Sequence, residues 1–396
     1  MAYKHTIFGA FASILLLLLA ACDSESEPVT DKSEETWTPR DAQMTLFMYM
    51  PWSEGLTGYL HSNLDDMEKV IVANNYGDCR VIAFICNSSI SAQMIELTPY
   101  GRITHKQYSA PDIATADGIA SILHDMQDIS PSPLYAMTIG CHGMGWLPAG
   151  SLNATPQTLV KSIKSATRYF GGLASQWQIN VTTLANALEL ADIHLQYLLF
   201  DACYMGGVEV AYSLKDNTDV FVASPTEIIN AGMPYNLIGN NLLQPQGVDW
   251  KEVCNKFLEF YKNYKLPFGI LSAIDCRKLD HLAITVKEIM ASHTWDYENN
   301  SMLQQFGGYK DDVLFYDLGQ YAETLAADSP SLINQFDNAL SQTVIAKVNT
   351  DYYYTDYTGA HRVTQFSGLS TSAPSTSPYA ADWNNTQWAQ DTNSSK

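Results

Sequence analysis

Continuous apolar runs recur along this chain, and amphipathic segments separate them. Apolar runs without polar alternation are typical of strands covered on both faces, as in a mostly parallel sheet. Two runs flanking a Pro-Tyr-Gly turn, 94–97 and 102–108, predict a hairpin. The remaining runs predict strands at 44–50, 80–86, 134–141, 196–200, 220–223 and 269–274.

The intervening segments have the spacing of amphipathic helices. In 63–73, for example, Leu64, Met67, Val70 and Ile71 fall on one face. Strands alternating with helices predict an α/β fold with a mostly parallel sheet and helices on both faces. Helices are predicted at 63–73, 117–125, 182–190 (with Thr182 as N-cap), 207–214, 250–261, 278–290, 318–326 and 331–348.

The N-terminus indicates an exported protein. Residues 1–21 resemble a signal peptide, because their apolar run is shorter than the roughly 20 residues of a membrane span. The run ends in Leu-Ala-Ala before Cys22, which resembles a lipobox and predicts acylation of Cys22 in the bacterial cell envelope, at the outer membrane or cell surface. Residues 22–40 are acidic and poor in apolar residues, as expected of a tether. The alternative is an ordinary signal peptide with an incidental Cys22.

Charge and cysteine content narrow the classes of function. Acidic residues number 42 against 22 basic ones, a net charge of −20. This balance argues against binding to nucleic acid and is compatible with cationic substrates, although acidity alone also serves solubility. The seven cysteines include no Cys-x-x-Cys pair, which argues against a structural zinc site.

Reactive side chains follow three of the predicted strands. Ligands of open α/β sheets bind beyond the carboxyl ends of the strands, so these side chains are expected at one edge. A buried cysteine or histidine is by itself usually structural. Cys203 is predicted where a strand meets a helix, whose N-terminus would lower the thiol pKa. The strand-end residues are His142 and Gly143, Asp201 and Cys203, and Ser224 and Thr226.

Two segments around these residues resemble signature segments of a known family. They are IGCHGMGW (139–146) and LLFDACYMGGVEVAY (198–212). Both are similar to segments of the clostripain-like cysteine peptidases, family C11 of clan CD, relatives of caspases, gingipains and legumain. Weaker matches are TLFMYM, ASPTEIINAGMPY (223–235) and SGLSTSAP (367–374), so the resemblance runs from about residue 45 to about 388. The chain departs from the family at 51–62 and at Ser372 and Ala373.

The resemblance implies a role for each site residue. Cys203 would attack the scissile carbonyl, and His142 would transfer protons. The backbone N–H groups of Gly143 and Cys203 would bind the oxyanion. Asp201 would line the S1 pocket and favour Arg or Lys at P1; its alternative is an N-cap for the following helix. Ser224 and Thr226 are further candidates for this pocket, and Cys141 is assigned to the core.

The resemblance also implies the domain organisation and a zymogen. Residues 41–275 would form a caspase-like catalytic core, and 276–396 a helical C-terminal extension packed on it. The loop at 147–178, between the His and Cys strands, would be cut by the protein itself after Lys161, Lys164 or Arg168; the alternative is an uncut loop. No cofactor is implied. Clostripain is stimulated by calcium, but the sequence has no EF-hand-type run of ligands, so the metal is left open.

These observations predict a lipid-anchored endopeptidase that cleaves proteins or peptides after Arg or Lys by a Cys/His dyad. The second hypothesis is a catalytically inactive family member that acts as a surface binding protein. A third, metal binding by Cys141, His142 and Cys203, is disfavoured because adjacent strand residues point to opposite faces.

Overall fold

The computed structural model of the protein describes residues 42–74, 77–153 and 169–393. The predicted signal peptide, Cys22, the tether, and Lys161, Lys164 and Arg168 lie outside the described residues. The described part of the chain belongs to one compact unit. Within it, no helix is both long and apolar enough to span a membrane.

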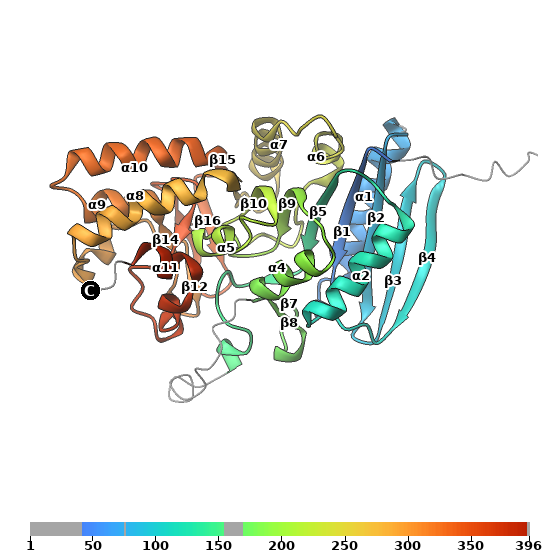
Figure 1. Ribbon diagram of the computed structural model, residues 1–396, viewed down its shortest axis with the longest axis horizontal. Coiled ribbons are helices and arrows are strands. Elements are labelled where there is room, and N and C mark those ends of the chain that lie inside the picture. The colour runs from blue at the N-terminus through green and yellow to red at the C-terminus, as the bar shows by residue number, and fades with distance from the viewer. Residues whose placement is uncertain (1–41, 75–76, 154–168, 394–396) are drawn as a thin grey trace, which may run out of the picture. The chain divides into compact units, whose positions relative to one another are not determined.

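A nine-stranded sheet forms the centre of the protein, in the order β15-β11-β10-β9-β5-β1-β2-β3-β4 (Figure 1). The five central strands are parallel, and two antiparallel strands follow on each side. The α/β fold is therefore confirmed. The strands are β1 (Met44–Met50), β2 (Cys79–Ser88), β3 (Ser91–Thr98), β4 (Gly101–Ser109), β5 (Tyr135–Gly140), β9 (Leu195–Asp201), β10 (Thr218–Ala223), β11 (Ile270–Asp275) and β15 (Val344–Asn349).

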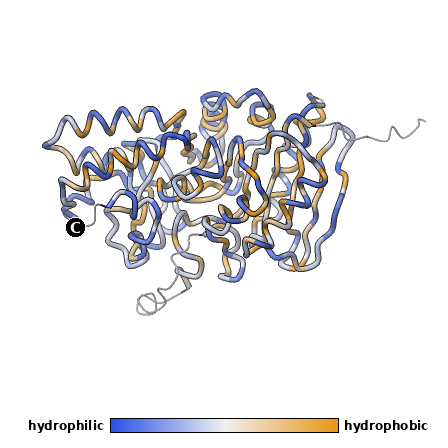
Figure 2. The backbone as a smooth tube through the Cα atoms, viewed as in Figure 1, coloured by the Kyte–Doolittle hydropathy of each residue, from blue (hydrophilic) through white to orange (hydrophobic). Residues whose placement is uncertain are grey.

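Helices cover both faces of the sheet, as its apolar strands require. In β1, Phe47 and Tyr49 join one hydrophobic cluster, and Leu46 and Met48 join the other. In Figure 2 hydrophobic residues gather along the strands, whereas the edge strand β4 is largely hydrophilic. One face is covered by α1 (Thr57–Asn74), α6 (Tyr235–Leu242) and α7 (Trp250–Asn263), and the other by α2 (Ala116–Ile129), α4 (Val181–Leu190) and α5 (Val208–Ser213).

The C-terminal residues carry four helices, α8 (Leu279–Ser292), α9 (Leu318–Leu325), α10 (Pro330–Thr343) and α11 (Gln387–Thr392). The helix predicted at 331–348 is wrong at its end, because α10 stops at Thr343 and the chain continues as β15. The β-branched Val344, Ile345 and Val348 favour a strand, and β15 pairs antiparallel with β11. The predicted extension thus contributes an edge strand to the sheet of the core. The N-cap of α4 is Asn180 and not Thr182.

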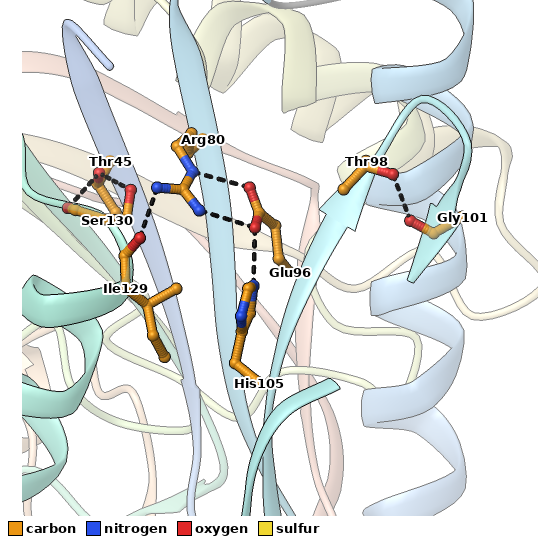
Figure 3. Close-up of polar contacts among 8 residues, drawn as sticks. All are labelled: Thr45, Arg80, Glu96, Thr98, Gly101, His105, Ile129 and Ser130. Atoms are coloured by element: carbon orange, nitrogen blue, oxygen red, sulfur yellow. Dashed lines mark hydrogen bonds and ion pairs between the residues drawn. The ribbon is translucent and has the colours of Figure 1, made fainter. Parts of the chain in front are cut away.

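A buried ion pair joins the amino-terminal end of β2 to β3 (Figure 3). This end of β2 is opposite the carboxyl ends of the strands, where the site is predicted. Nε and Nη2 of Arg80 each donate to the Glu96 carboxylate at 2.8 Å, and Arg80 also donates to the Ile129 carbonyl. The ring of His105 on β4 lies 2.8 Å from the same carboxylate. Both charges are satisfied, as burial demands. The cluster joins β2, β3, β4 and the end of α2.

Candidate active site

The predicted His and Cys come from neighbouring parallel strands, β5 and β9. Gly140 on β5 pairs with Asp201 on β9. His142 and Cys203 each come two residues after this pair, so both lie just beyond the same end of the sheet. Both line one cavity of about 340 Å³ at the carboxyl ends of these strands. The structure therefore brings the two together, as the strand-end rule predicts.

His142 has a defined partner that fixes its tautomer. It lies on β6 (His142–Gly143), which pairs with β7 (Tyr169–Gly171), and β7 pairs in turn with β8 (Gln178–Asn180). Its Nε2 lies 2.9 Å from the carbonyl oxygen of Glu54. Because a carbonyl only accepts, Nε2 carries the proton, and Nδ1 is the nitrogen that can take another.

Glu54 belongs to the segment that follows β1. Its carboxylate accepts from the backbone N–H of Leu173 at 2.7 Å, which holds the segment beside β7. This partner of His142 was missed from the sequence. A backbone carbonyl leaves no side-chain signal by which it could be found.

Cys203 lies in a turn and not at a helix N-terminus. Helix α5 begins five residues later, at Val208, with Gly207 as N-cap. The N–H of Ile228 donates to Sγ at 3.3 Å. Burial, reinforced by the charge of Glu227, raises the pKa of the Cys203 thiol to about 12. The expectation of a lowered pKa was therefore wrong, and the free protein holds a neutral thiol at neutral pH.

A glycine is required at position 143, because the loop of His142 and the turn of Cys203 approach each other closely there. A Cβ at this position would lie 2.4 Å from the carbonyl oxygen of Cys203 and 3.1 Å from the side chain of Ala202. The glycine thus admits the backbone of Cys203. Binding of an oxyanion by the N–H groups of Gly143 and Cys203 stays a prediction.

Asp201 lines the cavity from the end of β9 and is almost fully buried. Its Oδ2 accepts from Nδ2 of Asn63 at 3.0 Å, and its Oδ1 from the N–H of Met233 at 3.1 Å. Desolvation raises the pKa of the carboxyl to about 6, against the lowering effect of the hydrogen bond from the N–H of Met233. Asp201 does not cap α5, so the alternative assignment as an N-cap is wrong.

Two further carboxylates, those of Glu227 and Asp356, line the cavity, and neither was predicted from the sequence. Glu227 accepts from the Tyr204 hydroxyl at 2.9 Å and from the N–H of Asp356 at 3.1 Å. Burial raises the pKa of Glu227 to about 7. Among the described residues no Lys or Arg lines the cavity, and Asp201, Glu227 and Asp356 give it an acidic lining. Its apolar wall consists of Leu56, Tyr59, Leu60, Ile228, Ile229 and Leu266.

Ser224 and Thr226 lie elsewhere than expected. Both are fully buried, and their hydroxyls lie 3.1 Å apart. Neither lines the cavity. Their place in the pocket is therefore corrected: they shape the turn after β10, whose carbonyl oxygens accept from the N–H groups of Tyr204 and Gly206. Cys141 is buried in the core as predicted, and it also borders the cavity.

The described residues contain no group of three or more His, Cys, Asp or Glu side chains placed to hold a metal ion. His142 and Cys203 thus lie in an acidic, partly apolar cavity without a metal cluster in the described part of the chain. A thiol beside an imidazole can form a covalent acyl intermediate with a carbonyl substrate.

Comparison with known proteins agrees with this chemistry. The sequence model of the clostripain family matches residues 48–394. Iotapain, a secreted C11 cysteine protease from Bacteroides thetaiotaomicron, is 39% identical, with a TM-score of 0.83 over 89% of this chain and 100% of its own. A clostripain from the same organism, solved with the peptide inhibitor BTN-VLTK-AOMK, is 41% identical, with a TM-score of 0.55 over 57% of this chain and 99% of its own.

A more distant structure shares the fold alone. It is an inactive zymogen C11 protease from Parabacteroides distasonis, 23% identical, with a TM-score of 0.76 over 90% of this chain and 100% of its own. A search of curated proteins gives no match. The protein is thus a cysteine peptidase with an α/β fold. More particularly, it belongs to the clostripain family, C11.

Proposed function

We propose that this peptidase cleaves peptide bonds after Lys or Arg, with Cys203 as nucleophile and His142 as base. One observation carries the specificity: Asp201, two residues before Cys203, presents a buried carboxylate to a cavity that no described Lys or Arg lines. A buried carboxylate attracts a Lys or Arg side chain more strongly than an exposed one does.

The proposed reaction begins with a neutral thiol. When substrate binds, Nδ1 of His142 accepts the proton of Cys203 Sγ, and the resulting thiolate attacks the scissile carbonyl. The imidazolium then donates this proton to the leaving amine, which leaves an acyl-enzyme. Water, deprotonated by the neutral imidazole, hydrolyses the thioester and regenerates the thiol. The N–H groups of Gly143 and Cys203 are the candidate donors to the oxyanion.

The similar clostripain supports the P1 assignment. Its peptide inhibitor, BTN-VLTK-AOMK, has Lys as the last residue of its peptide VLTK. The test is a set of fluorogenic peptides that differ only at P1, with Lys, Arg, norleucine or Asp. We expect hydrolysis of the Lys and Arg peptides alone. Cleavage only after Asp or norleucine would refute the assignment of Asp201.

Activity should also depend on pH through Asp201. Because the pKa of this carboxyl is about 6, it is ionised at pH 7.5 and mostly protonated at pH 5. A cationic P1 side chain binds the ionised form, so this contribution is present above pH 6 and is lost as the pH falls through 6. We expect KM for the Lys peptide to rise roughly tenfold between pH 7 and pH 5.

The Asp201→Asn variant is the control for this pH dependence. Its KM should change less than that of wild type over the same range, because the amide does not titrate and only the other carboxylates of the cavity, such as Glu227, still do. Steady-state kinetics of both proteins in buffers of constant ionic strength measure the difference. Parallel KM profiles for the two proteins would contradict the assignment.

Self-activation is proposed from the basic residues between the His and Cys strands. Cleavage after Lys161, Lys164 or Arg168 would leave two fragments that remain associated. Mass spectrometry of the purified protein should find both fragments, whereas Cys203→Ala should remain whole. An active protein in one piece would refute self-cleavage and leave the peptidase assignment intact.

Attachment to the envelope is proposed from Cys22. Iotapain, to which this chain is similar, is a secreted protease, and this agrees with export of the chain. Metabolic labelling with palmitate should mark the wild type and spare Cys22→Ala. Absence of label on the wild type would refute the anchor.

A further inference from the structure

Three segments that are distant in sequence meet at Ser372. The first follows His142 and contains Trp146, the second is α5 after Cys203, and the third is the C-terminal segment around β18 (Ser370–Thr371). Oγ of Ser372 accepts from Nε1 of Trp146 at 2.7 Å. Its backbone N–H donates to Oε1 of Glu209, on α5, at 2.9 Å. One buried residue thus contacts both the loop that follows His142 and the helix that follows the turn of Cys203.

Glu209 fastens α5 to the C-terminal segment. Its carboxylate is fully buried, and a buried carboxylate persists only where donors surround it. Besides Ser372, the Thr371 hydroxyl donates to Oε1 at 2.8 Å and Nε1 of Trp383 at 2.7 Å. These three donors all come from the last part of the chain. The helix that follows the Cys203 turn is therefore held by residues far outside the cavity.

The C-terminal segment also binds the turn of Cys203 directly. The N–H of Ser370 donates to the carbonyl oxygen of Gly206 at 3.1 Å. The His and Cys loops lie in backbone contact, because a Cβ at Gly145 would lie 2.8 Å from the carbonyl oxygen of Tyr204. With so little space between the loops, a shift of either one changes the distance between His142 and Cys203.

We propose that Ser372 is a positioning residue that sets the loop of His142 relative to the loop of Cys203, through Trp146 on one side and Glu209 on the other. The inference rests on the proposed roles of His142 and Cys203.

A double-mutant cycle tests this role. Ser372→Ala removes the acceptor and Trp146→Phe removes the donor of one hydrogen bond. We expect each variant to lower kcat for the Lys peptide roughly tenfold, because small misplacements of reacting groups are costly. KM should stay within about twofold, since neither residue lines the cavity. The double variant should be no slower than the slower single variant, because both remove the same bond.

Ser375→Ala is the matched control, because it removes a hydroxyl from the same segment that donates to Val313 O at 2.7 Å. It should lower the melting temperature about as much as Ser372→Ala and leave kcat unchanged. An unchanged kcat in Ser372→Ala, equal losses of kcat in both serine variants, or multiplied losses in the double variant would overturn the inference.

Two outcomes keep this test separate from its premise. If Trp146→Phe does not fold, the comparison of Ser372→Ala with Ser375→Ala decides alone. If the wild type hydrolyses none of the peptides, the proposed function fails. If the wild type is active and Ser372→Ala equals it, only the positioning role fails.

Discussion

Replacing Cys203 with alanine should reduce hydrolysis of the Lys and Arg peptides by about 10⁴-fold or more, because covalent catalysis has no route without its nucleophile. His142 and the carboxylates of the cavity remain in this variant, so substrate should still bind. The measurement is kcat/KM for wild type and variant. Binding is tested with a Lys product peptide, by comparing its inhibition constant for wild type with its dissociation constant for Cys203→Ala.

Cys254→Ala is the control for this loss. Cys254 on α7 is a buried thiol, and burial raises its pKa to about 12, as it does for the partly buried Cys203. Because it lies outside the cavity, its removal should leave kcat/KM unchanged and cost about 1 kcal/mol of unfolding free energy. Residual hydrolysis of the Lys peptide by purified Cys203→Ala, at a rate near that of wild type, would refute the proposed nucleophile.

Asp201→Asn should lower kcat/KM for the Lys and Arg peptides roughly 100-fold, since it removes the buried partner of the P1 cation. The amide keeps the size of the side chain and an acceptor for the N–H of Met233. A peptide with norleucine at P1 should be cleaved no more slowly by the variant than by wild type. The effect therefore appears as a changed preference and not as a general loss.

Asp356→Asn separates a specific contact from the overall charge of the cavity. It removes the same charge from another wall, which the C-terminal residues supply. Because Asp356 is exposed and solvent screens its charge, the loss in kcat/KM should be at most about fivefold. Equal losses in the two variants would mean that Asp201 has no privileged contact with P1.

The strands were predictable because strands that are buried on both faces consist of continuous apolar runs, which are visible in the sequence. The run at 44–50 coincides with β1 residue for residue, and the others differ by a few residues at their ends. The position of β15 was not predictable in the same way. Its Val344 and Ile345 directly follow α10, and only the free edge of β11 determines that they form a strand.

The pair of His142 and Cys203 was predictable from strand ends, whereas the surroundings of the pair were not. Partners made by backbone, such as the carbonyl of Glu54, are independent of side-chain identity. The raised pKa of Cys203 depends on burial and on Glu227, which lies far away in sequence. The short α5 begins at Val208, within one residue of the predicted start at 207, and this start is too far along the chain from Cys203 for the helix N-terminus to lower the pKa of the thiol.

Ser224 and Thr226 illustrate a different limit. They follow a strand at the correct edge of the sheet, yet their hydroxyls face each other. From this segment it is the side chain of Glu227 that lines the cavity. Strand-end placement therefore selects segments that border the site, and the local turn decides which side chain of the segment faces it.

The most direct test of the account is covalent capture of the nucleophile by a peptidyl-Lys acyloxymethyl ketone, followed by mass spectrometry of the intact protein and of its fragments. We predict one adduct per chain, located on Cys203, with hydrolysis lost in proportion to labelling. An adduct on another residue, or full activity after complete labelling of Cys203, would contradict the account.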